Sequence, residues 1–302
     1  MHFMIVHVLF VTFFVILFTI LISQVAEAKV ANLTMGKASV WAIADSVGDR
    51  DASTFPGADP QALAKYMPSG KASTAIMVFL VKIENELILI DAGLGAPSGE
   101  RASHLHDILK LIGISPEQIT VVLITHMHPD HIGGLLRPDK SDEKAFPSAR
   151  VLSSRIEHDF WLGDESPKLF PSRAAGFEMA RKVFGIYGDT SETFEFGAAV
   201  APGIRAIDAR GHTPGNALFL LESEGERLLF WGDTLHAAAL QFPRPDINAH
   251  FDMNPKESAA TRARFMEMAA EEKLLIAGTH VPFPGIGTVE RAPEGGYIFI
   301  SR

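Results

Sequence analysis

The chain has 302 residues, of which 47% are hydrophobic and 21% charged, with a formal net charge of -9 and no cysteine. This composition is typical of a folded globular protein and excludes a disordered or fibrous chain. Clustered cations that bind a phosphate backbone are lacking, which argues against nucleic acid as a partner. Without cysteine, any bound metal has to be held by His and carboxylate side chains.

The first 28 residues are predicted to be an export signal and not part of the folded domain. Residues 3–22 are almost wholly apolar, and Ala26 and Ala28 follow them in the small-x-small pattern of a signal-peptide cleavage site. The apolar run is also long enough to span a bilayer, so a retained N-terminal membrane anchor is the alternative. In either case we expect residues 29–302 to form one domain in the periplasm or outside the cell.

Hydrophobic patterns in residues 29–302 predict strands and helices that succeed one another. Two strand-like segments at 75–81 and 86–91 look like a hairpin, and the second ends in a turn that begins at Asp91. Helical spacing of Leu and Ile follows at 104–112. Residues 120–125 form a short, β-branched apolar run, which is typical of a strand buried on both faces.

The remaining segments are assigned by the same patterns. They are a polar stretch containing 48–60, an aromatic-rich region at 150–187 that we expect to form a cap near a pocket, strands at 204–208, 217–222, 227–231 and 274–277, and a helix at 256–271.

Four residues of metal-ligand type follow the buried strand within six positions: His126, His128, Asp130 and His131. In extended backbone alternate side chains face the same way, so His126 and His128 can reach one metal. Pro129 then turns the chain, which would bring Asp130 and His131 to a second ion. The alternative is a surface loop that happens to be rich in His, and four ligand types at this spacing argue against it. The sequence therefore predicts a site for two metals.

This H-x-H-x-D-H pattern after a strand resembles the hallmark of the metallo-β-lactamase superfamily, and the resemblance extends along most of residues 29–302. It implies an α/β fold of the αββα type, in which two mixed sheets pack together with helices on both outer faces. It also implies further ligands at the ends of later strands. By resemblance, His126, His128 and His212 would hold the first metal, Asp130, His131 and His280 the second, and Asp233 would bridge them.

The implied ligand set suits zinc, which we expect, and also tolerates manganese, iron or cobalt. Two ions about 3.5–4 Å apart would supply a hydroxide as nucleophile, so no Ser or Cys nucleophile is required. Asp130 or Asp233 would then pass a proton to the leaving group. Asp91 matches a family position that orients a metal-bound His, although a turn-forming Asp is an equally good interpretation.

The C-terminal half is similar to methyl parathion hydrolase-like exported enzymes of the superfamily, in the segments 232–242 and 280–287. The resemblance implies an apolar pocket, and we predict Trp161, Phe242 and Phe283 as its aromatic side chains. For Trp161, ordinary core packing is about as good an interpretation.

His236 lies three residues after the predicted bridging Asp233. The N-acyl-homoserine lactonases, which are relatives in the same superfamily, would carry a Tyr at this position. It is interpreted as a catalytic side chain that donates a hydrogen bond to the substrate, or else as a structural His.

The reaction expected from these features is hydrolysis of a small apolar ester or lactone, such as an N-acyl-homoserine lactone. Organophosphate triester hydrolysis is the alternative, and it is disfavoured because residues 94–99 lack the Phe expected after the Asp91 turn. A β-lactamase-type hydrolase and a non-catalytic metal-binding module remain further alternatives. The expected partner is a small-molecule substrate and not nucleic acid. We expect contact with a membrane only through an uncleaved N-terminal segment. The sequence is compatible with a homodimer.

Overall fold

The computed structural model describes residues 29–95 and 102–302. The N-terminal segment with the predicted export signal or anchor lies outside these residues, as do residues 96–99 of the segment in which a Phe was sought. Within the two described ranges, no helix combines the length and the apolar character needed to cross a membrane.

The first large sheet comes from the N-terminal part of the described chain. In spatial order its strands are β1 (Val30–Met35), β2 (Ala38–Asp51), β3 (Lys71–Ile83), β4 (Glu86–Ile90), β5 (Val121–Leu123), β8 (Arg150–Ser154) and β9 (Ser191–Phe194). Pairing is antiparallel from β1 to β4 and parallel from β4 through β5 and β8 to β9. The sheet is therefore mixed, and β5 lies between two parallel neighbours.

The second large sheet comes from the C-terminal part. In spatial order its strands are β10 (Ala199–Ala201), β11 (Ile204–Asp208), β12 (Ala217–Ser223), β13 (Glu226–Phe230), β14 (Leu275–Ala277), β15 (Ile286–Arg291) and β16 (Tyr297–Ser301). Only the β13–β14 pair is parallel among these strands. A small separate hairpin joins β6 (Leu136–Arg137) and β7 (Lys140–Lys144).

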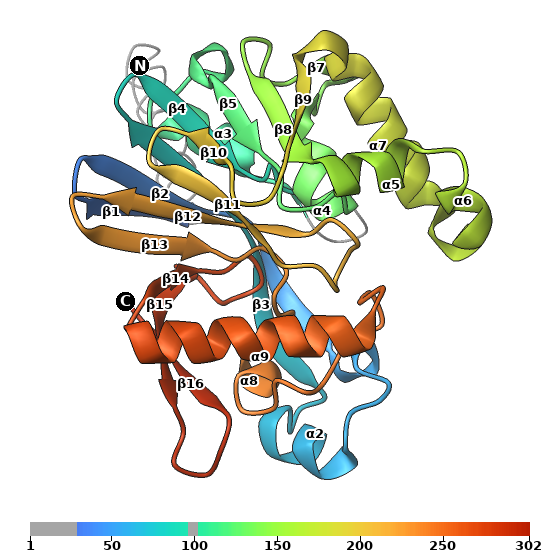
Figure 1. Ribbon diagram of the computed structural model, residues 1–302, viewed down its shortest axis with the longest axis vertical. Helices are drawn as coiled ribbons and strands as arrows, with labels where there is room; N and C mark the ends of the chain where they lie inside the picture. The colour runs from blue at the N-terminus through green and yellow to red at the C-terminus, as the bar shows by residue number, and fades with distance from the viewer. Residues whose placement is uncertain (1–28, 96–101) are drawn as a thin grey trace, which may run out of the picture.

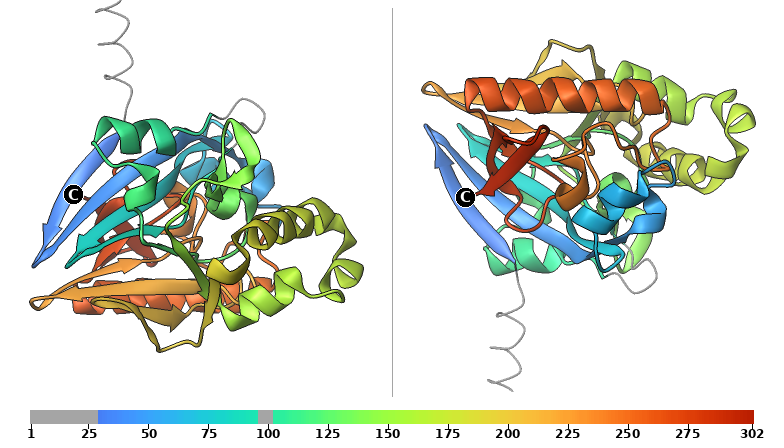
Figure 2. Two further views of the ribbon diagram at one scale, coloured as in Figure 1. Left: turned by 90° about the horizontal axis from the view of Figure 1, so that it is seen from above. Right: turned by 90° about the horizontal axis from the view of Figure 1, so that it is seen from below.

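Helices cover both outer faces of the sheet pair. The α-helices of the described residues are α2 (Pro60–Tyr66), α3 (Leu105–Leu111), α4 (Pro129–Ile132), α5 (Arg155–Leu162), α6 (Ser166–Leu169), α7 (Ala174–Tyr187), α8 (Ala238–Gln241) and α9 (Pro255–Glu272). The views show α3 on the outer face of the first sheet and α9 along the outer face of the second (Figures 1 and 2). This is the predicted αββα arrangement, so the fold class is confirmed.

Alternation along the central strands fills the layers between the sheets and the helices. Phe79 of β3 points between the sheets and meets Phe230 of β13, with ring centroids 5.4 Å apart. The neighbouring Leu80 points the other way, into the core under α3 and α7. Leu229 of β13 likewise points outward and packs with Phe265 of α9. Each strand with period-two burial thus contributes to two cores, and burial of each such side chain contributes about 1.5–3 kcal/mol.

Most predicted elements are present, and one boundary was wrong. The predicted hairpin is the antiparallel β3–β4 pair, and the helix expected at 104–112 is α3. The polar stretch expected from residue 48 instead begins as strand, because β2 continues to Asp51 and pairs Gly48 with Thr74. This end of β2 is largely exposed, so its residues carry no hydrophobic alternation.

Backbone hydrogen bonds join the two sheets at one edge. The Ala217 N–H donates to the Thr125 carbonyl over 2.9 Å, and the Met77 N–H donates to the Thr279 carbonyl over 3.0 Å. Loops that follow strands of both sheets are therefore held side by side, and the predicted ligands lie on these loops.

Candidate metal centre

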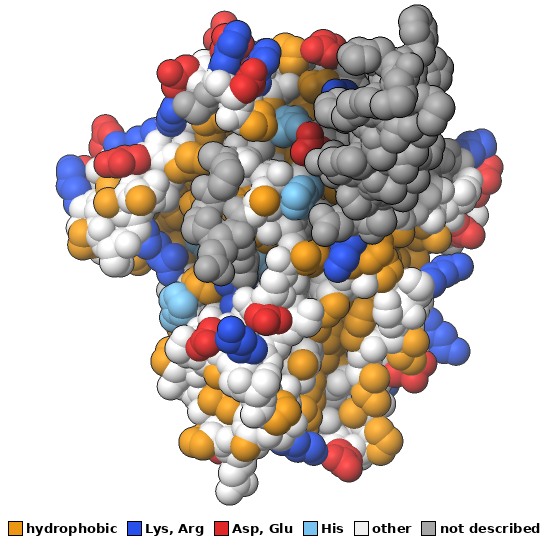
Figure 3. Space-filling view, turned by 180° about the vertical axis from the view of Figure 1, so that it is seen from behind, with side chains coloured by type: hydrophobic (Ala, Val, Ile, Leu, Met, Phe, Trp, Pro, Cys, Tyr) orange, Lys and Arg blue, Asp and Glu red, His pale blue; other side chains and the backbone are white. Residues whose placement is uncertain are grey.

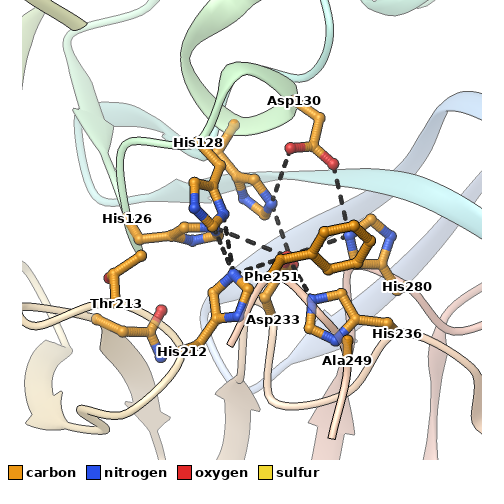
Figure 4. Close-up of polar contacts among 12 residues, drawn as sticks. His126, His128, Asp130, His212, Thr213, Asp233, His236, Ala249, Phe251 and His280 are labelled. Carbon is orange, nitrogen blue, oxygen red and sulfur yellow. Dashed lines mark hydrogen bonds and ion pairs between the residues drawn. The ribbon is translucent and has the colours of Figure 1, made fainter. Parts of the chain in front are cut away.

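The segment after β5 is extended and presents alternate side chains to opposite sides. Met127 is fully buried in the core under the helices. His126 and His128 point the other way, with Nε2 of His126 2.9 Å from Nδ1 of His128 (Figure 4). The period-two geometry predicted for this segment is thus what the chain adopts.

A tight turn follows and carries the next two ligand-type residues. Pro129 occupies the first position of α4, where its missing N–H costs nothing, and Asp130 and His131 follow within the same turn. Gly133 and Gly134 then lie directly against the 92–94 turn, where an added Cβ would collide with a carbonyl oxygen. Because glycine has no side chain, this Gly pair allows the α4 turn to pack against the end of β4.

The second sheet contributes its side chains from separate loops. His212 follows β11, Asp233 follows β13, and His280 follows β14. All three side chains are buried. They converge on the His-rich segment of the first sheet (Figure 4).

Three imidazoles form the first cluster. Nε2 of His212 lies 3.2 Å from Nε2 of His126 and 2.9 Å from Nδ1 of His128. Oδ2 of Asp233 lies 3.7 Å from His126 Nε2 and 3.4 Å from His212 Nε2. One ligand atom from each of these four residues lies within 4.8 Å of the others.

The second cluster contains Asp130, His131 and His280. Nε2 of His280 lies 3.5 Å from Asp130 Oδ2. Asp233 faces this cluster too, with Oδ1 3.0 Å from His131 Nε2 and Oδ2 3.2 Å from His280 Nε2. The structure therefore brings together all seven predicted ligands, with Asp233 between the two groups.

The donor atoms in these clusters fit divalent cations. His131 Nε2 and Asp233 Oδ1 are buried and lie 3.0 Å apart as an ion pair, with no other polar partner that meets hydrogen-bond geometry among the described residues. In the first cluster three ring nitrogens approach one another, although each neutral imidazole has only one N–H to share. Buried polar atoms without partners are costly, and a cation at the point of convergence would satisfy them.

Carboxylates orient two of the imidazoles through the ring nitrogen that points away from the clusters. Asp91 Oδ2 lies 2.7 Å from His131 Nδ1, and Asp91 also accepts hydrogen bonds from the backbone N–H and hydroxyl of Thr125. Its φ of 60° is unusual for a residue other than Gly, and these hydrogen bonds hold the strained conformation. Asp91 is thus more than a turn residue.

Asp252 has the same relation to His212, and the sequence analysis missed it. Its Oδ1 lies 2.9 Å from His212 Nδ1, and its Oδ2 accepts from the buried guanidinium of Arg262 at 3.2 Å. Asp252 lies in an irregular loop before α9, where no motif or periodicity marks it. Nothing in the local sequence signals this contact with a residue 40 positions away.

Burial and neighbouring charges set the protonation of the cluster. Burial lowers the pKa of His126 and of His128 well below the usual value, so both rings are neutral and able to act as ligands. Burial opposes ionisation of His131 as well, but the carboxylates of Asp233 and Asp91 outweigh it and raise the pKa of His131 well above the usual value. The raised pKa favours a protonated His131 when no metal is bound, and a cation bound at its Nε2 would displace that proton.

The two remaining predicted catalytic side chains differ in exposure. The Asp130 side chain is 26% exposed and borders the cavity over the clusters. His236 is buried, with Nε2 3.3 Å from Asp233 Oδ2 and its ring stacked on His280. Burial lowers the pKa of His236 to about 4, so its ring is neutral at physiological pH.

A cavity of about 810 Å³ lies over the clusters. His128, Asp130, Asp233, His236 and His280 line its base. The other side chains in its wall include Ile76, Leu94, Phe251, Arg50, Lys71 and Arg173. Arg50 lies over the face of the Phe251 ring, 5.1 Å from its centroid.

The three aromatic residues predicted for the pocket wall do not line this cavity. Trp161 is buried with its ring edge-on to His128, at a centroid distance of 5.5 Å. Phe242 stacks on Phe299 in the core under α9, and Phe283 packs partly buried against the inter-sheet core. Phe251, which the sequence analysis did not single out, lines the cavity instead, because the loop before α9 folds over the site.

Charges on the outer surface are mixed. On the face shown in Figure 3, Lys and Arg side chains are interspersed with Asp and Glu and do not gather into one block. The described residues visible on that face therefore form no broad cationic surface of the kind that binds a phosphate backbone.

Comparison with known proteins gives one matching family. The family model of the Metallo-beta-lactamase superfamily matches residues 74–280. A solved structure of the hydrolase AbOPH in the beta lactamase superfamily is 31% identical, with a TM-score of 0.84, and covers 91% of this chain and 98% of that chain. AidC, a dizinc quorum-quenching lactonase in complex with a product N-hexanoyl-L-homoserine, is 26% identical with a TM-score of 0.83 and the same coverage.

Curated relatives are more distant. An N-acyl homoserine lactonase of Bacillus thuringiensis is 22% identical over 234 residues, which cover 70% of this chain and 84% of that protein. The chain spans only 37% of an atrochrysone carboxyl ACP thioesterase of Passalora fulva and 49% of Ribonuclease TTHA0252 of Thermus thermophilus.

Proposed function

The chain belongs to the metallo-β-lactamase superfamily and is a hydrolase, and on that premise we propose that it hydrolyses a small lactone or ester at a centre for two divalent metal ions. The observation that carries this proposal is the position of Asp233. Its carboxylate lies 3.0 Å from His131 Nε2 and 3.4 Å from His212 Nε2, so it faces both ligand clusters. Zinc is the proposed metal, because the donors are His and carboxylate and AidC is a dizinc enzyme.

Each side chain has a defined part in this proposal. His126, His128 and His212 would hold one ion, Asp130, His131 and His280 the other, and Asp233 both. Ions bound there would supply an activated water and polarise the scissile carbonyl. Asp91 and Asp252 fix the orientation of His131 and His212, so that the ring nitrogens facing the clusters keep their lone pairs.

Asp130 is the better candidate for moving the proton to the leaving oxygen. Its side chain is partly exposed to the cavity, whereas the Asp233 carboxylate is buried among imidazoles. His236 borders the same cavity, and its Nδ1 has no hydrogen-bond partner within the described ranges, whereas its Nε2 lies 3.3 Å from Asp233 Oδ2. A neutral ring in this position can donate a hydrogen bond to a substrate oxygen.

A lactone is favoured over a phosphotriester by the cavity and by the relatives. Two of the reported relatives are lactonases, and one of them is covered over 98% of its length. The wall expected of a phosphotriester pocket is aromatic, but of Phe, Trp and Tyr side chains only Phe251 lines the described cavity. The proposed substrate is therefore an N-acyl-homoserine lactone or a similar small ester.

The proposal places this activity outside the cytoplasm, because residues 3–22 are apolar and a small-x-small site follows them. Cell fractionation with N-terminal sequencing tests this. A periplasmic or secreted chain beginning near residue 29 supports a cleaved signal, a membrane-bound full-length chain supports an anchor, and a cytoplasmic chain contradicts export.

A parallel assay of the metal-loaded protein tests the activity. The substrates are an N-hexanoyl homoserine lactone, an aryl acetate, a dimethyl aryl phosphotriester and a β-lactam. We expect the lactone to give the highest kcat/KM and His126→Ala to abolish its turnover, whereas Asp159→Asn on the exposed side of α5 leaves it unchanged. Dominant phosphotriester or β-lactam turnover would reverse the substrate assignment. Metal binding without turnover of any of the four would contradict the catalytic proposal.

A further inference from the structure

Glu157 is a fully buried carboxylate that lies behind the first ligand cluster. Its Oε1 accepts hydrogen bonds from the Met127 N–H at 2.9 Å and from the indole N–H of Trp161 at 2.6 Å. Its Oε2 accepts from the Thr213 hydroxyl at 2.8 Å and from the Gly215 N–H at 2.9 Å. Four donors thus surround one carboxylate, and no cationic side chain is paired with it among the described residues.

The donors belong to the two loops that carry the imidazoles of this cluster. Met127 lies between His126 and His128, on the loop after β5 of the first sheet. Thr213 and Gly215 follow directly after His212, on the loop after β11 of the second sheet. One side chain therefore holds the backbone of both loops, one with each oxygen.

The start of α5 places Glu157 between these loops. Ser154 caps the helix by accepting the Glu157 N–H, and its hydroxyl donates to the Gly215 carbonyl at 2.7 Å. Gly215 lies so close to the Glu157 backbone that an added Cβ would collide with it. The Ser-x-x-Glu spacing is that of a capping box, but the carboxylate is turned toward the ligand loops.

We propose that Glu157 is a positioning residue for the metal centre, which sets the distance between the His126–His128 pair and His212. The inference rests on the proposed metal site and not on any substrate. A charged carboxylate suits four donors, because each of its oxygens accepts more than one hydrogen bond. Trp161 extends this contact, since its ring lies against His128 while its N–H binds Glu157.

Glu157→Gln is the direct test, because it keeps the shape but leaves only one accepting oxygen for two loops. Zinc affinity is measured by competition with a chromophoric chelator, and the visible absorption spectrum is recorded after loading with cobalt. We expect the zinc dissociation constant of one of the two ions to rise by about 10- to 100-fold and the cobalt spectrum to change. Asp159→Asn, which alters an exposed carboxylate of the same helix, should leave both unchanged.

A purely structural role gives a different result. If Glu157→Gln lowers the melting temperature of the metal-free protein but keeps both zinc dissociation constants and the cobalt spectrum of the wild type, the inference is overturned. These readouts need no substrate, so the inference can fail while hydrolysis stands, and hydrolysis can fail while the inference stands.

Milder variants cover the case in which Glu157→Gln does not fold. Trp161→Phe and Thr213→Val each remove one of the four donors and retain the carboxylate. Each is expected to weaken zinc binding by roughly 3- to 10-fold, the effect of one hydrogen bond. Wild-type zinc affinity in both variants would also overturn the inference.

Discussion

The two sheets supply ligands to the same centre in different ways. The first sheet contributes His126, His128, Asp130 and His131 from one continuous stretch after β5. The second sheet contributes His212, Asp233 and His280 from three loops that are far apart in sequence. Local backbone geometry is enough to arrange the first set, whereas the second depends on the packing of the two sheets at one edge.

The carboxylates that orient the imidazoles of the two sets also differ in how they are held. His131 is oriented by Asp91 at the end of β4, next to β5 in the same sheet. His212 is oriented by Asp252, which is itself held by Arg262 of α9. Both supporting carboxylates lie 40 positions from their imidazole, but Asp91 is held within the first sheet and Asp252 by an irregular loop and α9. Substitutions can compare the two arrangements directly.

Asp233→Asn gives the largest expected effect, because this side chain belongs to both arrangements. We expect kcat/KM to fall by at least about 10³-fold, since ligands of one centre act as a unit, and both metal dissociation constants to rise. Steady-state assays and metal analysis of the same preparation measure this. A variant that retains a tenth of the activity with two bound ions would show that Asp233 does not link the clusters.

Asp252→Asn and Asp91→Asn compare the supports. Each is expected to weaken metal binding by about 10- to 100-fold, because the supported imidazole loses its fixed orientation. Asp252→Asn should also lower stability, since it leaves the buried Arg262 guanidinium without its anionic partner. Chelator competition and thermal unfolding check both. Equal loss of stability in the two variants would contradict the distinction between a support held within the sheet and one held by Arg262 of α9.

Metal removal tests whether the centre ties the sheets together. Linkage predicts about 4 kcal/mol of stabilisation at a metal concentration 1,000 times the dissociation constant. For a domain of this size the melting temperature should fall by roughly 10 °C in excess chelator. Differential scanning calorimetry with and without chelator measures the shift. If a His126→Ala, His280→Ala double variant shows the same shift in melting temperature, the stabilisation comes from metal bound at other sites.

A smaller effect is expected at Tyr187, the last residue of α7. Burial raises the pKa of Tyr187 from 10.0 to about 12, and its hydroxyl donates to the Leu135 carbonyl and accepts from the Phe146 N–H. The raised pKa means that its contribution to stability is complete below pH 10 and is lost as the pH rises toward 12.

Tyr187→Phe leaves the Phe146 N–H unpaired, whereas the Leu135 carbonyl keeps its hydrogen bond from the Ala145 N–H, and it should cost about 1–3 kcal/mol at neutral pH. Denaturant unfolding at pH 8 and pH 11 compares it with the wild type. The difference between the two proteins should shrink at the higher pH, and a constant difference would contradict the assigned pKa.

The sequence predicted the first half of the centre because local rules suffice there. Alternation in extended backbone and the Pro129 turn specify how four ligand-type residues are presented. The remaining ligands were identified by resemblance to a family and not by spacing. No local pattern places His212 beside His126, since that contact depends on the packing of one sheet against the other.

The pocket wall and the Asp252 support were not predictable for the same reason. Asp252 and Phe251 lie in an irregular loop, and their position over the site depends on how α9 packs. Trp161 was expected in the pocket because aromatic side chains there fit an apolar ester. Its indole N–H instead donates a hydrogen bond to Glu157, and its ring packs against Phe177 in the core. Composition alone does not distinguish a wall residue from a buried residue one layer behind it.

The most direct test of the central claim is the zinc content of the purified protein and of two ligand variants, measured by mass spectrometry of the metal. The account predicts two zinc ions per chain in the wild type and one in each of His212→Ala and His280→Ala, which affect different clusters. One ion in the wild type, or two in either variant, would contradict a shared centre built from both sheets.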